Sequence, residues 1–165
     1  MEQKVMRVKK DKTPQQALQS LMRMCARSER SSGDALRLMK RWGVADDEAK
    51  KVLARLQADR FIDDARYAEA FVRDKLNLSG WGAYKIKMSL RAKGVSQGII
   101  NEVVAPMIAE TDMSERLEEV MRRKLRTLKY SSAYEAKGKL IRFAASRGYD
   151  LDDAVECASK IVTEN

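Results

Sequence analysis

Apolar residues recur three or four positions apart along most of the chain, in short segments divided by glycine or by helix-capping residues. This spacing predicts amphipathic helices. The first predicted helix follows Thr13-Pro14, a capping hydroxyl with a proline suited to the first helical position, and runs to about Arg27. A second starts near Ser32 and ends at Gly43, and a third follows the acidic first turn at residues 46–48.

The same pattern then begins again at Asp63-Asp64, which we interpret as helix caps rather than as a metal or acid–base pair. After a break at residues 79–82, the next helix closes at Gly94. Ser96 caps the helix that follows, and Pro106 is expected to kink or end it. The predicted inner face of this helix is Ile99, Ile100, Val103 and Met107.

A third round of helices begins with two predicted capping boxes, which start at Asp112 and Ser132. The helix after Ser132 runs toward Gly148, and Asp150 caps the last helix. The side chains of that last helix predicted to face inward are Leu151, Ala154, Val155, Ala158 and Ile161.

Three glycines that close helices set the register of a repeat, because Gly43, Gly94 and Gly148 are 51 and 54 residues apart. Any helix–glycine–helix protein could give similar matches, and that alternative stays open. We predict an all-α fold of three tandem three-helix repeats in an elongated, curved arrangement. The predicted divisions are a flexible basic N-terminal arm (1–12) and three repeats (13–62, 63–110 and 111–165).

The chain is strongly basic, with a formal net charge of +9 and a pI near 9.6. Such a charge favours nucleic acid phosphates, anionic lipid or an acidic protein surface as partners. The sequence shows neither an apolar stretch long enough to span a bilayer nor a signal-peptide pattern at its start. We therefore expect a cytoplasmic protein.

Residue types needed for common catalytic sites are scarce in this chain. It contains no histidine and only two cysteines, Cys25 and Cys157, both at apolar helix positions, where reduced core thiols are expected. Its glycines do not form a phosphate-binding loop, and its serines do not lie in a nucleophile turn. We predict a protein that is not an enzyme, with no catalytic residue, cofactor or metal site.

The basic residues that remain form two clusters that could contact DNA. Within the middle repeat, Lys87 and Arg91 share a helix face beside the apolar stripe, so both are expected to be exposed. The alternative for each cluster is a solvated helix face. Trp81 and Tyr84 could stack on bases or pack between repeats. The candidate contacts are Lys85, Lys87, Arg91, Lys93, Arg73, Lys75, Arg122, Arg123 and Arg126.

The block from Arg60 to Lys75 (RFIDDARYAEAFVRDK) resembles the signature block of the RecX family, bacterial regulators of RecA. Two further segments resemble that family: Gly82, Ile86, Leu90 and residues 93–95, and, earlier in the chain, residues 27–31. The resemblance covers about residues 17–107 and is weak beyond them. The family often has a proline where this chain has Ala83, and the turn at residues 79–82 also departs from its pattern.

The resemblance implies a modulator, usually an inhibitor, that binds the RecA–single-stranded DNA filament and acts in recombination, DNA repair and the SOS response. It implies no catalytic residues or cofactors, and we expect a monomer that could also bind double-stranded DNA. The alternative is a general, sequence-independent architectural DNA-binding protein that needs no recombinase. A third possibility is a protein that binds membrane surfaces through basic amphipathic helices.

Overall fold

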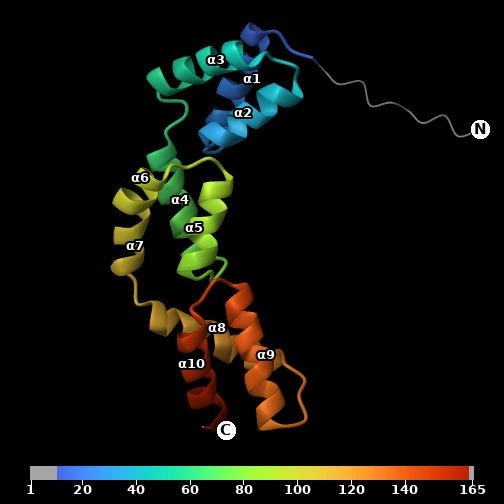
Figure 1. The fold of residues 1–165 in the computed structure, drawn as a ribbon, viewed down its shortest axis with the longest axis vertical. Coiled ribbons are helices and arrows are strands. Elements are labelled where there is room, and N and C mark those ends of the chain that lie inside the picture. Colours follow the sequence, from blue (N-terminus) through green and yellow to red (C-terminus); the bar gives the residue numbers. More distant parts are fainter. Residues whose placement is uncertain (1–10, 164–165) are drawn as a thin grey trace, which may run out of the picture. The chain divides into compact units, whose positions relative to one another are not determined.

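The structure is a computed structural model that describes residues 11–163, and every regular element there is a helix (Figure 1). This confirms the predicted all-α class with tandem helical repeats. The chain forms two compact units. The first unit holds the residues up to Tyr67 together with Lys93–Val95, and the second holds Ala68–Ala92 and the residues from Ser96 onward. The boundaries of the three predicted repeats stay a prediction.

The first unit is built on α1 (Pro14–Arg27), α2 (Ser32–Arg41) and α3 (Asp46–Ala58). The start of α1 is the predicted capping box. The backbone N–H of Gln16 donates to Thr13 Oγ1 at 3.2 Å, and the Thr13 N–H donates to Gln16 Oε1 at 3.0 Å. The largest fully buried side chains of this unit are Leu21, Met39, Leu56 and Ile62.

Most of the predicted N-terminal arm, residues 1–10, lies outside the described residues. Lys12, also assigned to the arm by the sequence, is instead attached to the first unit. Its backbone N–H donates to the Trp42 carbonyl at 2.9 Å, and its ammonium lies 4.7 Å from the Trp42 ring centroid. The same ammonium donates to Ser20 Oγ at 3.0 Å.

Helix α4 (Asp64–Asn77) begins at the acidic pair that the sequence assigns to capping. Asp63 is the cap, since its carboxylate accepts the Arg66 backbone N–H at 3.0 Å. Asp64 does not cap. Its carboxylate accepts the backbone N–H of Ser32 at 2.8 Å and the Ser32 hydroxyl, so it joins α4 to the start of α2.

The second unit continues with α5 (Ala83–Ala92), α6 (Gln97–Ile99) and α7 (Ala105–Ala109). Between α6 and α7 lies one π-helical turn, η1 (Ile100–Val104). The chain therefore continues through a widened turn where the sequence predicts one regular helix. Such π-turns are rare and are usually single turns within longer helices.

The sequence predicts that Pro106 kinks or ends this helix. It does not end it, because the helix continues to Ala109. The Ala105 N–H donates to the Ile100 carbonyl five residues earlier, so the turn before the proline is already wide. A proline ring clashes with the carbonyl four residues before it in a regular α-helix, and the wide turn relieves that clash. The extra residue also brings Val104 into the core, while Val103, predicted to face inward, is half-buried.

Three longer helices complete the second unit: α8 (Met113–Thr127), α9 (Ala133–Ser146) and α10 (Leu151–Thr163). Two predictions for α10 are wrong. Leu151 and Val155 were predicted to face inward, but they are 58% and 44% exposed. The apolar residues of α10 occupy more of its circumference than α8 and α9 cover. The core of these three helices is formed by Leu117, Met121, Ala136, Leu140, Ala144, Ala154, Ala158 and Ile161.

The capping box predicted at the start of α9 forms only in part. Ser132 Oγ accepts the backbone N–H of Glu135 at 3.1 Å, as expected. The Glu135 carboxylate, however, accepts the Ser131 hydroxyl at 2.6 Å and the Ser131 N–H at 3.2 Å. Because the Ser131 hydroxyl and the Lys139 ammonium both bond the charged carboxylate, the pKa of Glu135 falls to about 2.

The three glycines of the predicted register all have a left-handed backbone. Their φ angles are +76° at Gly43, +83° at Gly94 and +90° at Gly148. Residues with a Cβ rarely adopt this backbone conformation, so each glycine allows the chain to leave one helix and turn into the next. The shared conformation confirms that each of the three glycines ends a helix, and the register of the repeat stays a prediction.

Candidate nucleic-acid interface

Two of the predicted cations lie together on the indole ring of Trp81, in the second unit. The Lys75 ammonium is 4.5 Å and the Lys85 ammonium 4.4 Å from the ring centroid. The ring itself packs edge-on against Phe71, with centroids 6.1 Å apart and an interplanar angle of 71°. Trp81 thus packs within its own unit and holds both lysines by cation–π attraction. We call Phe71, Lys75, Trp81 and Lys85 the tryptophan cluster.

The other two predicted cations of α5 differ in how they meet solvent. Arg91 is exposed, and its Nε donates to Gln97 Oε1 at 2.9 Å. Lys87 was predicted to be exposed but is only half-exposed. Both side chains belong to the same unit as the tryptophan cluster.

Arg73 and Arg122 each have a glutamate partner one helical turn earlier. The Arg73 guanidinium bonds the Glu69 carboxylate, and Arg122 bonds Glu118 at 2.8 Å. Hydrogen bonds from Arg122 and then from Lys160 lower the pKa of Glu118, so this carboxylate stays charged. Two paired arginines of this kind present less net charge to a phosphate than unpaired ones do.

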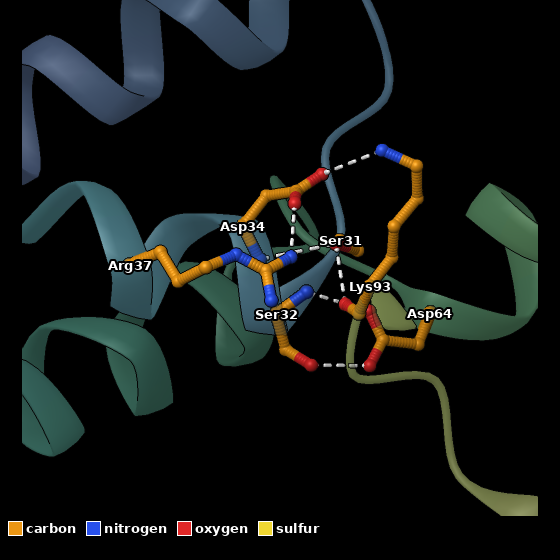
Figure 2. A network of polar contacts seen from close by, with 6 residues as sticks. All are labelled: Ser31, Ser32, Asp34, Arg37, Asp64 and Lys93. Atoms are coloured by element: carbon orange, nitrogen blue, oxygen red, sulfur yellow. Dashed lines mark hydrogen bonds and ion pairs between the residues drawn. The ribbon is translucent and has the colours of Figure 1, made fainter. Parts of the chain in front are cut away.

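Lys93 lies in the first unit, in a polar network around the start of α2 (Figure 2). Its ammonium is 3.7 Å from the Asp34 carboxylate, and its carbonyl accepts the Ser31 hydroxyl at 2.8 Å. Ser32 and Asp64 form the second arm of the same network. Lys93 therefore contributes to the packing of the first unit.

Four basic side chains of the second unit line a cavity of about 430 Å³. It is bounded by the end of α4 and the loop after it, by α8, and by the end of α9. Of the predicted contacts, Arg123 lines this cavity, whereas Arg126 is exposed elsewhere on α8. The charged side chains that line it are Arg116, Glu119, Arg123, Lys124 and Arg147.

Two of the cavity's cations lie against one aromatic ring. The Lys124 ammonium and the Arg147 guanidinium are each 5.0 Å from the ring centroid of Phe143. Within residues 11–163, Arg123, Lys124 and Arg147 form no ion pair with a carboxylate. An anion entering the cavity would therefore meet cations whose charge is not neutralised.

The part of the chain that the structure describes contains neither a cluster of potential metal ligands nor a membrane-spanning helix. No three potential metal-ligating side chains gather at one place there. The described helices also include none that is both long and apolar enough to cross a bilayer.

Comparison with known proteins bears directly on the second unit. Residues 63–104 match the family model described as "RecX, second three-helix domain", and residues 110–157 match "RecX, third three-helix domain". Together these matches cover more than half of the 165 residues. The chain belongs to the RecX family.

Relatives named "Regulatory protein RecX" extend the similarity toward the first unit. One from Clostridium botulinum (strain Eklund 17B / Type B) is 34% identical over 76% of this chain and 58% of its own length. One from Pseudomonas entomophila (strain L48) is 29% identical over 85% of this chain and 88% of its own length. The chain thus spans less than two thirds of the clostridial RecX and most of the Pseudomonas one.

The fold also matches a solved RecX structure. A crystal structure of RecX from Lactobacillus salivarius superposes with a TM-score of 0.72, over 92% of this chain and 97% of that chain. The sequence identity is 18%, so this likeness concerns the fold alone.

Sequence analysis of this RecX chain did not identify how the basic residues are grouped. Lys124, Arg147 and Phe143 are not among the contacts predicted from the sequence. A glutamate stands four residues before Arg122 and another four residues before Arg123, a spacing that places each pair on one helix face, so the sequence does not show that Arg122 is the one that pairs. No local signal brings α4, α8 and α9 around one cavity.

Proposed function

We propose that this chain binds the RecA–single-stranded DNA filament and inhibits RecA in recombination and DNA repair. The observation that carries the proposal is membership of the RecX family, whose relatives bear the name regulatory protein. We expect a cytoplasmic monomer that acts within the SOS response and uses no cofactor. Its own residues supply charge and shape, and the proposal needs no catalytic step.

The basic side chains of the second unit support this proposal. Lys75 and Lys85 lie on the Trp81 ring, Lys87 and Arg91 lie on α5, and none of the four has a carboxylate partner among the described residues. Such cations suit the phosphate backbone of a DNA strand, which is recognised by charge and not by sequence. Three other proposed contacts are less favourable for binding a phosphate, because each already forms an ion pair with a carboxylate. They are Arg73, Lys93 and Arg122.

The direct test measures RecA activity with and without this chain. Adding the purified protein at fewer copies than RecA should slow single-stranded-DNA-dependent ATP hydrolysis and strand exchange. Unchanged rates for both reactions would contradict the proposal. A gel-shift titration at two salt concentrations, with and without RecA, separates it from a general architectural DNA-binding role, which predicts tight and steeply salt-dependent binding without RecA.

Charge reversal on α5 should weaken the inhibition. We expect Lys87→Glu with Arg91→Glu to raise the half-inhibitory concentration by about tenfold or more, since each lost contact to a charged group is worth roughly 1.5–3 kcal/mol. The measurement is RecA ATPase inhibition, with folding checked by circular dichroism.

A matched control changes the same charge in the first unit. Arg41 and Lys50 are exposed there, and neither has an ion pair among the described residues. Arg41→Glu with Lys50→Glu should leave inhibition close to that of the unmodified chain. If the α5 variant were folded and inhibited equally well, the assignment of this helix as a contact surface would be wrong.

A further inference from the structure

We propose that the cavity between α4, α8 and α9 binds one nucleotide of single-stranded DNA, with a phosphate held by Arg123, Lys124 and Arg147. This inference rests on the proposed function, for which it supplies a specific DNA-binding site. It assigns a role to residues outside the α5 surface. Four features of the cavity favour this ligand: its charge, its fixed walls, its size, and the hydrogen bonds that its backbone carbonyls already accept.

The charge of the cavity favours a phosphate. Arg123, Lys124 and Arg147 all lack a carboxylate partner within residues 11–163, and Glu119 is the acidic side chain in the lining. Arginine donates two parallel N–H groups that match phosphate oxygens, and lysine adds a compact charge. Moving a phosphate into the site would neutralise all three cations, of which Lys124 and Arg147 now lie against the Phe143 ring.

The walls of the cavity are fixed before any ligand arrives. On one side, Arg116 donates to the Leu76 carbonyl at 2.9 Å and to Asn77 Oδ1 at 3.1 Å, which ties α8 to the end of α4. On the other side, the Arg147 carbonyl accepts the backbone N–H of Gly82 at 2.7 Å. A preformed site loses less conformational freedom when it binds, and therefore binds more tightly.

The size and apolar lining of the cavity suit a nucleotide better than a bare ion. Its volume of about 430 Å³ lies within the usual range for small-ligand sites, roughly 300–1,000 Å³. Val120 lines the cavity and the 82%-exposed side chain of Leu78 lies at its edge, so both can contact a sugar or base. The Phe143 ring is already in contact with two cations, so we do not assign base stacking to it.

An acidic peptide is the competing ligand, and the backbone of the cavity disfavours it. Peptides in grooves commonly bond the main chain of their host. Here the Leu76 carbonyl accepts from Arg116, and the Gly80 carbonyl accepts the Tyr149 hydroxyl at 2.9 Å. Each of these carbonyls already accepts one hydrogen bond, whereas a phosphodiester needs only the side-chain donors.

The test measures binding of a fluorescent oligo-dT to the full chain by anisotropy, in the absence of RecA. Arg123→Glu with Lys124→Glu should weaken binding by about 100-fold or more at low salt. The slope of log affinity against log salt should fall by about 0.7, the value for one lost phosphate contact on a single strand. The matched control is Lys137→Glu with Arg142→Glu on α9, which makes the same charge change outside the cavity lining and should cost less than about tenfold.

Several results would overturn the site. The first is that the unmodified chain fails to bind oligo-dT. The second is that the two double variants lose affinity for oligo-dT equally. The third is that poly-glutamate competes as strongly as unlabelled oligo-dT. Inorganic phosphate should compete only weakly, and strong competition by it would reduce the site to a simple anion site. If the glutamate variant fails to fold by circular dichroism, Arg123→Gln with Lys124→Gln replaces it, with an expected loss of at least about tenfold.

The outcome for the cavity is separable from the outcome for the proposed function. Oligo-dT binding is measured without RecA, so its loss or retention concerns the cavity alone. RecA inhibition by the unmodified chain concerns the proposed function alone. A chain that inhibits RecA but whose cavity variant binds oligo-dT normally would refute only the cavity.

Discussion

Replacing Gly148 with alanine should lower the free energy of unfolding by roughly 2–6 kcal/mol, because two costs act together. The backbone at Gly148 has φ +90°, which strains any residue with a Cβ. An added Cβ would also lie 2.4 Å from the backbone nitrogen of Lys85, well inside van der Waals contact. That approach cannot open easily, since the Tyr84 N–H donates to the Gly148 carbonyl at 3.1 Å. Urea denaturation followed by circular dichroism measures the loss.

Gly98 offers a matched control in the same unit. It lies in α6 with ordinary helical φ, and an added Cβ would meet only Ser96 Oγ, at 3.8 Å. Gly98→Ala should leave stability unchanged or raise it by up to about 1 kcal/mol through helix propensity. A loss below about 1 kcal/mol for Gly148→Ala would show that α5 does not pass this closely.

Sequence reasoning located the helix ends well because the signals for them are local. Thr13 and Ser96 cap the helices that they were predicted to cap, and the three register glycines have the expected left-handed backbone. What the glycines face could not be predicted. Gly82, for example, lies where an added Cβ would meet the Gly148 carbonyl oxygen at 2.5 Å, a contact between segments far apart in the sequence.

Errors arose where tertiary contacts decide between local alternatives. Asp63 and Asp64 look equivalent as caps, yet only Asp63 caps α4, because Ser32 approaches Asp64 from a separate helix. Helix α3 is followed by Arg60 in the left-handed region at φ +60°, where no glycine marks the turn. Leu151 looks like a core residue by spacing and is exposed. Periodicity shows which residues share a face but not whether another helix covers that face.

In the candidate site too, helical periodicity does not show which side chains meet a partner. Arg122 and Arg123 are neighbours in one basic run, but a helix places them about 100° apart. Arg122 consequently pairs with Glu118, while Arg123 lines the cavity. Counting charges selected Arg122 and Arg123 alike. Only the folding of α4 and α9 beside that helix separates the residue with a free charge from the one whose charge is neutralised.

Replacing Ser31 with alanine should destabilise the first unit by roughly 2–4 kcal/mol, since one hydroxyl makes two bonds. Ser31 is fully buried. Its oxygen accepts the Asp34 N–H at 3.2 Å, which caps α2, and its hydroxyl donates to the Lys93 carbonyl at 2.8 Å (Figure 2). Alanine would remove the cap and leave that carbonyl without this donor. Urea denaturation of the full chain measures the change.

Ser132 provides the matched control, because it caps α9 in the same way but is exposed. Its oxygen accepts the Glu135 N–H at 3.1 Å and has no counterpart to the Lys93 carbonyl among its bonds in the described residues. Ser132→Ala should therefore cost only about 1 kcal/mol, the usual effect of losing a cap. The difference between the two variants measures how strongly the hydroxyl of Ser31 attaches Lys93 to α2. Equal losses would mean that this bond adds no stability and that Lys93 is held by the Asp34 ion pair and by packing against Gly33.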